Sequence, residues 1–188
     1  MVLSGQTVVY GGSFNPPHMG HQMACLYLIE ALGADAVWML PAWVHPFGKA
    51  LEAFEHRLQM CRLLAEPFGE RVRISEVERE VDSGGRTFDT LRHLIAGEPT
   101  RRFALAVGTD ILEETHAWHR WDDIQKMVEI VVIGRQGFET PPGGLALPEV
   151  SSSEIRALLA RGEPIRGMVP ASVADYVAAH QLYRGAPS

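Results

Sequence analysis

The chain has 188 residues, of which 46% are hydrophobic and 21% are charged, and its formal net charge is -6. These values are ordinary for a globular protein, and the length fits one domain, so we expect a single domain over residues 1–188 with a C-terminal helical part at about 151–183. The negative charge argues against a protein that binds nucleic acid through a general basic surface.

The sequence also argues against membrane insertion and export. No apolar run reaches the roughly 18 residues of a transmembrane helix, and the N-terminus lacks the basic and apolar regions of a signal peptide. Cys25 and Cys61 each lie in an apolar helical pattern, so we expect two buried thiols rather than a disulfide framework. We therefore expect a soluble protein of the reducing cytoplasm, with neither a membrane nor a nucleic acid as a partner.

The N-terminal stretch combines a buried strand, glycines and a helix start. An apolar run predicts a strand over Thr7–Tyr10, with a tight turn at Gly11 and Gly12. A helix is expected over His18–Leu32, closed by Gly33 as its C-terminal cap. Glycines let the backbone come close to a ligand, and the free N–H groups of a helix start attract an anion, so phosphate is the expected ligand.

The remaining elements alternate along the chain. We expect further strands at Ala36–Leu40, Val72–Ile74, Phe103–Val107 and Glu129–Ile133, and helices at Phe54–Leu64, Thr87–Ile95 and Ala171–His180. Alternation favours right-handed crossovers and a parallel sheet, so the predicted fold is α/β, doubly wound and Rossmann-like, with helices on both faces. The last helix is expected to pack against the sheet.

Two further segments have simple local patterns. Ser151 and Glu154 have the spacing of a capping box, which predicts the start of a short helix. The Pro- and Gly-rich segment Thr140–Pro148 is expected to be a surface loop.

His18 and His21 are the first candidates for chemistry. They lie three residues apart, on one face of the predicted helix, and both rings could donate hydrogen bonds to one phosphoryl group. Two surface histidines at a helix start are an equally simple interpretation. Zinc binding is a third, although no other ligand of usual spacing is nearby.

Two motifs resemble the signatures of the HxGH nucleotidyltransferases. These are GGSFNPPHMGH at residues 11–21 and VSSSEIR at residues 150–156. The segments GRTFDTL (85–91), VGTDILEETHAWHRWDDI (107–124) and RGMVPASVADYVAAHQLY (166–183) resemble nicotinate mononucleotide adenylyltransferases. The resemblance implies adenylyl transfer from ATP to nicotinate mononucleotide, which gives nicotinate adenine dinucleotide and pyrophosphate in NAD biosynthesis.

The resemblance also implies roles for individual residues. The catalytic groups would be His18, His21, Lys49 and Arg156. The ATP-binding residues would be Gly12, Ser13, Phe14, His18, His21, Gly108, Asp110, Arg135, Ser152, Ser153 and Arg156. Lys49, Thr87 and Trp118 would bind the acceptor, with the indole stacked on the pyridine ring. Mg²⁺ would bridge phosphate oxygens, with few or no protein ligands.

Several alternatives stay open on the sequence. The loop His45–Lys49 reads HPFGK where relatives usually carry a P-P-H-K pattern, so the acceptor could differ, and phosphopantetheine is one candidate. The altered loop also allows a nucleotide-binding module without turnover. A metal-dependent hydrolase built on four histidines is a further possibility. Trp118 and Trp121 could be core residues of a short helix, and His116 and His119 are expected at the surface.

Overall fold

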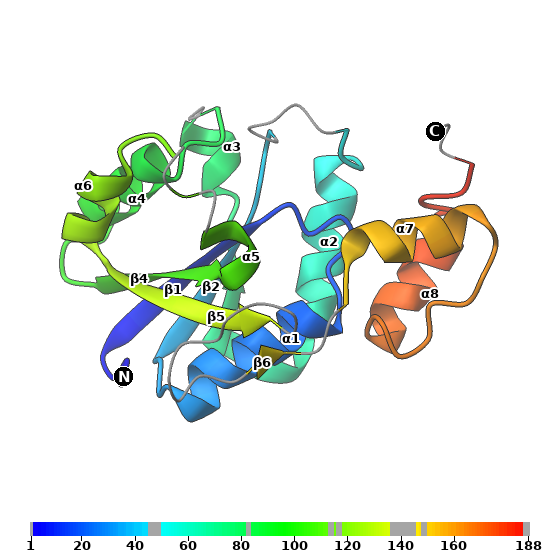
Figure 1. Ribbon diagram of the computed structural model, residues 1–188, viewed down its shortest axis with the longest axis horizontal. Helices are drawn as coiled ribbons and strands as arrows, with labels where there is room; N and C mark the ends of the chain where they lie inside the picture. The colour runs from blue at the N-terminus through cyan, green and yellow to red at the C-terminus, as the bar shows by residue number, and fades with distance from the viewer. Residues whose placement is uncertain are drawn as a thin grey trace.

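A parallel sheet forms the centre of the molecule. The computed structural model describes residues 2–44, 50–81, 84–112, 115, 118–135, 146–147 and 150–185. Its six strands lie in the order β3-β2-β1-β4-β5-β6 (Figure 1). Their bounds are β1 (Gln6–Gly12), β2 (Ala36–Pro41), β3 (Val72–Ile74), β4 (Arg102–Gly108), β5 (Glu129–Arg135) and β6 (Ala146–Leu147). Each adjacent pair is parallel, which confirms the predicted doubly wound α/β fold.

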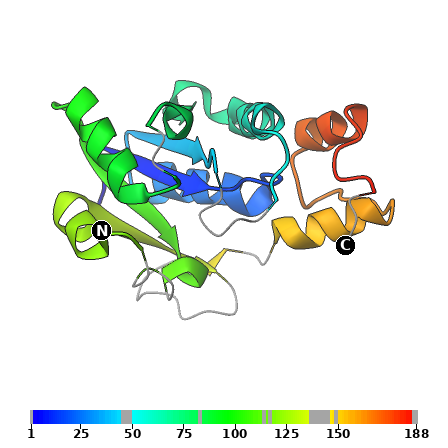
Figure 2. The ribbon, with the colours of Figure 1, turned by 90° about the horizontal axis from the view of Figure 1, so that it is seen from above.

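The helices lie between successive strands and after the last one. They are α1 (Met19–Leu26), which continues as a π-helical turn (Tyr27–Ala31), α2 (Phe54–Ala65), followed by a 3-10 turn (Glu66–Arg71), α3 (Val77–Val81), α4 (Thr87–Gly97), α5 (Thr109–Leu112), α6 (Trp121–Met127), α7 (Ser152–Ala160) and α8 (Ala171–Ala179). Figures 1 and 2 both show α7 and α8 beyond α2, at the opposite end of the molecule from α4 and α6. No helix of the described residues has the length and apolar character that a membrane crossing requires.

Alternating strand residues divide the interior into two cores. In β2, Val37 and Met39 belong to the core that includes residues of α1 and α2, while Trp38 and Leu40 belong to the core that includes residues of α3, α4 and α6. Successive side chains of a strand point to opposite faces, so each core covers one face of the sheet. The predicted helices on both faces are therefore confirmed.

The predicted turn at Gly11 and Gly12 is wrong. Both glycines belong to β1, where they pair with Leu40 and Pro41 of β2. Ladder pairing with β2 carries the strand two residues further than the apolar run indicated. The predicted first helix is matched by α1 and the π-helical turn that follows it, which together run from Met19 to Ala31. Gly33 lies just beyond this segment with a φ of 71°, which confirms the predicted glycine cap.

Two predictions about the C-terminal third need correction. Helix α8 contacts α2 rather than lying on the sheet, and the hydroxyl of Tyr176 hydrogen-bonds Nδ1 of His56 across that contact. The predicted surface loop 140–148 contains β6, which pairs with β5 and buries Leu147. Residues 140–145 and 148 lie outside the described residues.

The two cysteines are buried as predicted. Cys25 lies in α1 and Cys61 in α2, and neither side chain is exposed. Burial raises the pKa of the Cys25 thiol to about 12 and raises that of Cys61 as well. Both thiols therefore stay protonated and unreactive at neutral pH.

Short α3 was missed by the sequence pattern, yet it carries a buried polar contact. The Thr90 hydroxyl of α4 donates to the Glu78 carboxyl at 2.6 Å. Burial raises the pKa of Glu78, and the hydrogen bond from Thr90 opposes that shift. Ionisation of Glu78 is therefore less favourable in the folded protein than in the unfolded chain.

We predict that Glu78→Gln removes part of the pH dependence of stability. Because the folded-state pKa of Glu78 is raised, its contribution to stability falls as the pH rises from the unfolded pKa, about 4.3, through the folded one. The amide keeps an acceptor for Thr90 and does not ionise, so the variant should gain stability relative to the parent across this window. Urea unfolding between pH 4 and 7 measures it, with Glu80→Gln at an exposed position of α3 as control. Parallel curves for parent and variant would contradict the prediction.

Candidate active site

The first signature lies where the strand order reverses. β1 ends at Gly12, and its neighbour β4 ends at Gly108, so their carboxyl ends flank one crevice of the sheet. Ligands of doubly wound sheets bind outside the carboxyl ends of the strands at this point. The candidate site is therefore the loop 13–18 between β1 and α1.

Packing of Phe14 fixes the shape of this loop. Its φ is 45°, a left-handed conformation that is uncommon for a bulky residue, and its side chain is 1% exposed. The ring meets the ring of His21 edge-on at 4.9 Å and that of Tyr10 at 5.7 Å. A Cβ on Gly12 would lie 3.1 Å from the Phe14 ring, so glycine leaves the room that this ring occupies.

The two histidines meet at the start of α1. His18 is the N-cap residue rather than part of the first helical turn, and it is 2% exposed. Its backbone N–H donates to Nδ1 of His21 at 3.1 Å, and the two ring centroids lie 3.7 Å apart. Because Nδ1 accepts this bond, the neutral ring of His21 carries its proton on Nε2, where it can be donated.

The helix start offers fewer free N–H groups than the sequence suggested. The Met19 N–H donates to the Met168 carbonyl at 2.8 Å, and the His21 N–H donates to the His18 carbonyl at 2.9 Å. Two of the first backbone donors of α1 are thus occupied within the protein. An anion at this end of α1 would depend more strongly on side-chain donors.

The second signature begins with a capped helix, as predicted. Ser151 is the N-cap residue of α7, and its hydroxyl oxygen accepts the Glu154 N–H at 3.0 Å. This bond satisfies one of the unpaired donors at a helix N-terminus.

Side chains of α7 join the two signatures. The Ser152 hydroxyl donates to the Pro16 carbonyl at 2.8 Å, and Nη1 of Arg156 donates to the Asn15 carbonyl at 2.7 Å. Nη2 of Arg156 donates to the Ser153 hydroxyl oxygen at 3.2 Å. The structure therefore brings the arginine of one signature onto the loop of the other, although the two are more than 130 residues apart in sequence.

The sequence analysis missed the roles of Asn15, Arg57 and Tyr183 around this loop. The Asn15 side chain is 3% exposed, and its Oδ1 accepts the Tyr183 hydroxyl at 3.0 Å and the Glu52 N–H at 3.2 Å. Arg57 is 1% exposed and donates to the carbonyls of Ser13 and Glu52, each at 2.9 Å.

A helical pattern could have pointed to Arg57. It lies three residues after Phe54 and four before Cys61, both buried on the inner face of α2. Positions three and four apart share one face of a helix, so an arginine there is placed toward the interior. Its hydrogen-bond partners are backbone carbonyls and leave no side-chain pattern in the sequence.

Two of the predicted acceptor residues, Thr87 and Trp118, lie with the core that covers the other face of the sheet. Thr87 is the first residue of α4 and is partly buried. Trp118 and Trp121 are partly buried against the core that contains Phe88, and their ring centroids lie 5.6 Å apart. His119 is exposed, as predicted.

Some predicted site residues cannot be placed. Lys49 and the rest of the HPFGK loop, residues 45–49, lie outside the described residues, as does His116. Asp110 and Arg135 lie in α5 and at the end of β5, but their side chains are outside the described part of the structure.

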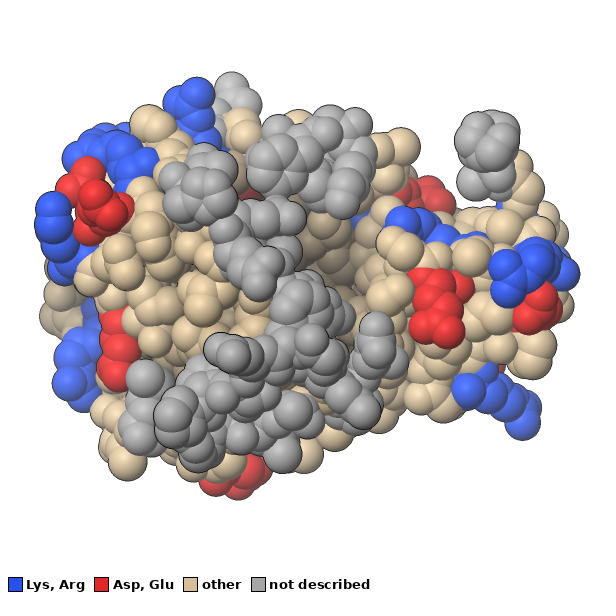
Figure 3. Space-filling view, viewed as in Figure 1, with Lys and Arg blue, Asp and Glu red and all other residues tan. Residues whose placement is uncertain are grey.

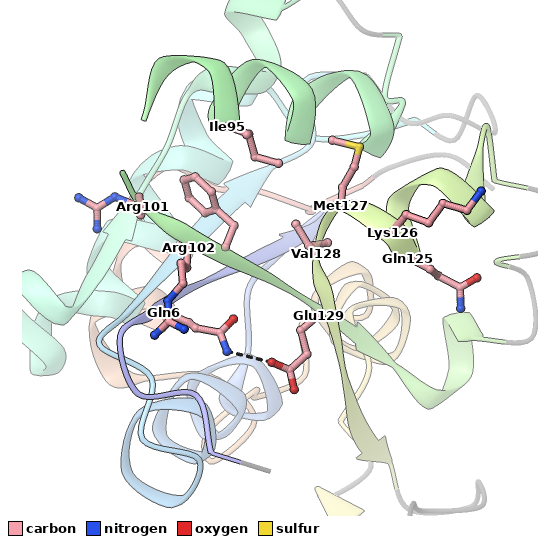
Figure 4. Close-up of a pocket in the computed structure, with 10 residues that line it drawn as sticks. Gln6, Ile95, Arg101, Arg102, Gln125, Lys126, Met127, Val128 and Glu129 are labelled. Atoms are coloured by element: carbon pink, nitrogen blue, oxygen red, sulfur yellow. Dashed lines mark hydrogen bonds between the residues drawn. The ribbon is translucent and has the colours of Figure 1, made fainter. Parts of the chain in front are cut away.

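A cavity of about 530 Å³ lies far from this loop, at the amino ends of the strands (Figure 4). Gln6 of β1 donates to Glu129 of β5 at 2.9 Å across it. Two arginines that line the cavity are already hydrogen-bonded within the protein. Arg102 donates to the Ser4 carbonyl, and Arg101 donates to the Thr7 hydroxyl. Catalytic loops of parallel sheets lie at the carboxyl ends, so this cavity is not the candidate site.

Charge on one broad face does not identify the site either. Figure 3 shows basic and acidic side chains gathered at the two ends of this face, over α4 and α6 and over α7 and α8. Between these ends, the described surface consists mostly of uncharged residues. Anion binding at the loop would thus depend on individual donors rather than on a broad basic surface.

A family model and several relatives of known name assign the chain to one family. The cytidylyltransferase-like family model matches residues 9–158. A relative from Anaeromyxobacter dehalogenans (strain 2CP-C), named "Probable nicotinate-nucleotide adenylyltransferase", is 52% identical over 96% of this chain and 97% of its own. The chain belongs to the nicotinate-nucleotide adenylyltransferases. A member from Myxococcus xanthus with the same name is 42% identical over 95% of this chain and 94% of its own.

Solved structures support the fold. The nicotinic acid mononucleotide adenylyltransferase of Plasmodium falciparum superposes with a TM-score of 0.79 at 19% identity, over 95% of this chain and 97% of its own. A Vibrio parahaemolyticus protein gives a TM-score of 0.76 at 20% identity, over 96% of each chain. The architecture of this nucleotidyltransferase is therefore shared at low sequence identity.

We predict that Ser151→Ala lowers the free energy of unfolding by about 1 kcal/mol, because it removes the acceptor of the Glu154 N–H at the start of α7. Urea unfolding measures the change. Ser151→Asp keeps a side-chain acceptor and should retain most of the parental stability. Equal losses in both variants would contradict a capping role.

Proposed function

We propose that this protein transfers the adenylyl group of ATP to nicotinate mononucleotide, giving nicotinate adenine dinucleotide and pyrophosphate. The observation that carries the proposal is the convergence of both signatures on one loop, through the bond from Arg156 to the Asn15 carbonyl. The name shared by its relatives supports the choice of acceptor. The cytoplasm is the proposed location, and residues 1–188 are proposed to act as one domain.

The reaction needs stabilisation of charge rather than an enzyme nucleophile. A phosphate oxygen of nicotinate mononucleotide, largely ionised at neutral pH, forms a bond to the α-phosphorus of ATP. The bond from that phosphorus to the oxygen bridging to the β-phosphate breaks, and pyrophosphate leaves with the electron pair. Negative charge grows on the transferred and leaving groups, and preorganised donors stabilise it.

The donors around the loop suit this task. His18 and His21 are proposed to bind the α- and β-phosphates, with Nε2–H of His21 as one donor. The two ring centroids lie 3.7 Å apart, so both rings could reach neighbouring oxygens of one polyphosphate.

The second signature is proposed to bind the rest of the triphosphate. Arg156 retains donors beyond those used for Asn15 and Ser153, since a guanidinium has five N–H groups. The Ser152 hydroxyl donates to Pro16, so toward a phosphate it is proposed to act through its place at the α7 N-terminus. The further ATP-binding residues proposed are Gly12, Ser13, Phe14, Gly108, Asp110, Arg135 and Ser153, and Lys49 is the further catalytic residue proposed.

Magnesium fits this donor set only together with the nucleotide. No cluster of three or more His, Cys, Asp or Glu in the described residues could hold a metal ion. The loop presents imidazoles, a guanidinium and hydroxyls, which bind phosphate oxygens, whereas Mg²⁺ prefers oxygen ligands that the phosphates supply. When bound with ATP, Mg²⁺ would neutralise phosphate charge.

A direct assay tests the proposal. Purified protein with Mg²⁺, ATP and nicotinate mononucleotide should release pyrophosphate and form the dinucleotide. His18→Ala or His21→Ala should lower turnover by roughly 100-fold or more, since each removes a preorganised donor. Phosphopantetheine and nicotinamide mononucleotide serve as comparison acceptors. Pyrophosphate release no higher than in the His18→Ala variant would refute the proposed reaction, and ATP binding without turnover would indicate a binding module.

Trp118→Ala should raise the KM for nicotinate mononucleotide by about tenfold and leave the KM for ATP within about twofold. An indole stacked on the pyridine ring contributes to acceptor binding alone, on the scale of other aromatic pairs. Steady-state kinetics with each substrate varied measures the split. Trp121→Ala removes the neighbouring indole and is the matched control for packing. Equal damage to both KM values in Trp118→Ala would contradict the assigned place.

A further inference from the structure

Arg57 places a buried charge directly against the loop of the first signature. Its Nη1 donates to the Ser13 carbonyl and its Nε to the Glu52 carbonyl, each at 2.9 Å. None of the ion pairs within 4.0 Å among the described residues involves Arg57. Among the described residues, the hydrogen bonds of this guanidinium therefore go to backbone carbonyls rather than to a carboxylate.

Burial of a charged guanidinium is unfavourable, and packing of the core alone does not require a charge at this position. Burial lowers the pKa of Arg57, and the nearby Cys61, Tyr183, Glu52 and Glu55 partly oppose that shift. An arginine nonetheless stays charged at neutral pH. Without it, the carbonyls of Ser13 and Glu52 would lose these donors, so the guanidinium ties the loop backbone to α2.

Asn15 extends the same network to the C-terminal segment. A backbone N–H can only donate, so the bond from Glu52 identifies the atom facing it as the amide oxygen of Asn15. The same oxygen accepts the hydroxyl of Tyr183. Burial raises the pKa of Tyr183, which keeps that hydroxyl protonated and able to donate. Arg57 and Tyr183 thus bind the loop at two places, the Ser13 carbonyl and the Asn15 side chain.

We infer that Arg57 is a positioning residue of the phosphate site: its fork holds the backbone at Ser13, and its buried charge favours a polyanion on that loop. Tyr183 supports the same loop through Asn15. Electrostatic attraction across a low-dielectric interior is stronger than across water, so a cation beneath the loop acts on a phosphate that it does not touch. The inference rests on the proposed binding of ATP at this loop.

The test compares neutral and charged replacements of Arg57. Arg57→Met should weaken ATP binding by about tenfold, the usual scale for a lost charge-assisted hydrogen bond, with binding of nicotinate mononucleotide changed by less than about twofold. Arg57→Lys keeps the charge and should recover most of the lost ATP affinity. Calorimetry with each nucleotide and Mg²⁺ measures binding without turnover. Arg62→Met, at an exposed position of the same helix, should match the parent.

Tyr183→Phe keeps the ring and removes only the donor to Asn15. It should weaken ATP binding by about threefold and leave acceptor binding unchanged, and it tests the network even if Arg57→Met does not fold. Equal losses for both nucleotides, unchanged ATP affinity, or an Arg57→Lys variant no better than Arg57→Met would overturn the inference. A parent protein that binds ATP but forms no dinucleotide would refute the proposed acceptor while leaving this test intact.

Discussion

Two hydrogen bonds from α7 to one loop organise the whole candidate site. The Ser152 hydroxyl and the Arg156 guanidinium donate to the carbonyls of Pro16 and Asn15, at 2.8 and 2.7 Å. A loop that follows a buried strand has carbonyls without ladder partners, and such groups need donors. Side chains of α7 supply donors to these two loop carbonyls. The same bonds place the N-terminus of α7 beside the start of α1. Stability and site assembly thus depend on the same contacts.

The sheet could be predicted because its cause is local. Apolar runs such as Val72–Ile74 gave the exact bounds of β3, and alternation with helices indicated parallel pairing. Local patterns do not determine the order of the strands. β1 pairs with β2 on one side and with β4 on the other, and this order depends on the crossover connections and on tertiary packing. The end of β1 likewise depends on tertiary pairing that the local sequence does not show, as Gly11 and Gly12 illustrate. Their residue type suggested a turn, whereas pairing with Leu40 and Pro41 keeps them in the strand.

The polar motifs of the candidate site could be predicted from the sequence, but the residues that hold its loop in place could not. His18, His21 and Arg156 were identified by motif, and the structure places all three on or against the loop 13–18. Arg57 and Tyr183 were missed because each bonds to a group 44 or 168 residues away in sequence, and no local spacing encodes such a partner. The candidate ligand-binding residues form short motifs in the sequence, while the residues that hold their loop are brought to it only by the tertiary fold.

The proposed binding of a polyanion by this acidic protein depends on where its charges lie. The formal net charge is -6, and some of the described surface charges form ion pairs with each other, as Arg120 does with Asp123. Arg57, by contrast, is buried, and Arg156 is partly buried, and both donate to backbone carbonyls of the signature loop. Screening by salt weakens exposed charges more than buried ones. For the proposed nucleotide site, the cations next to the loop therefore matter more than the net charge of the whole chain.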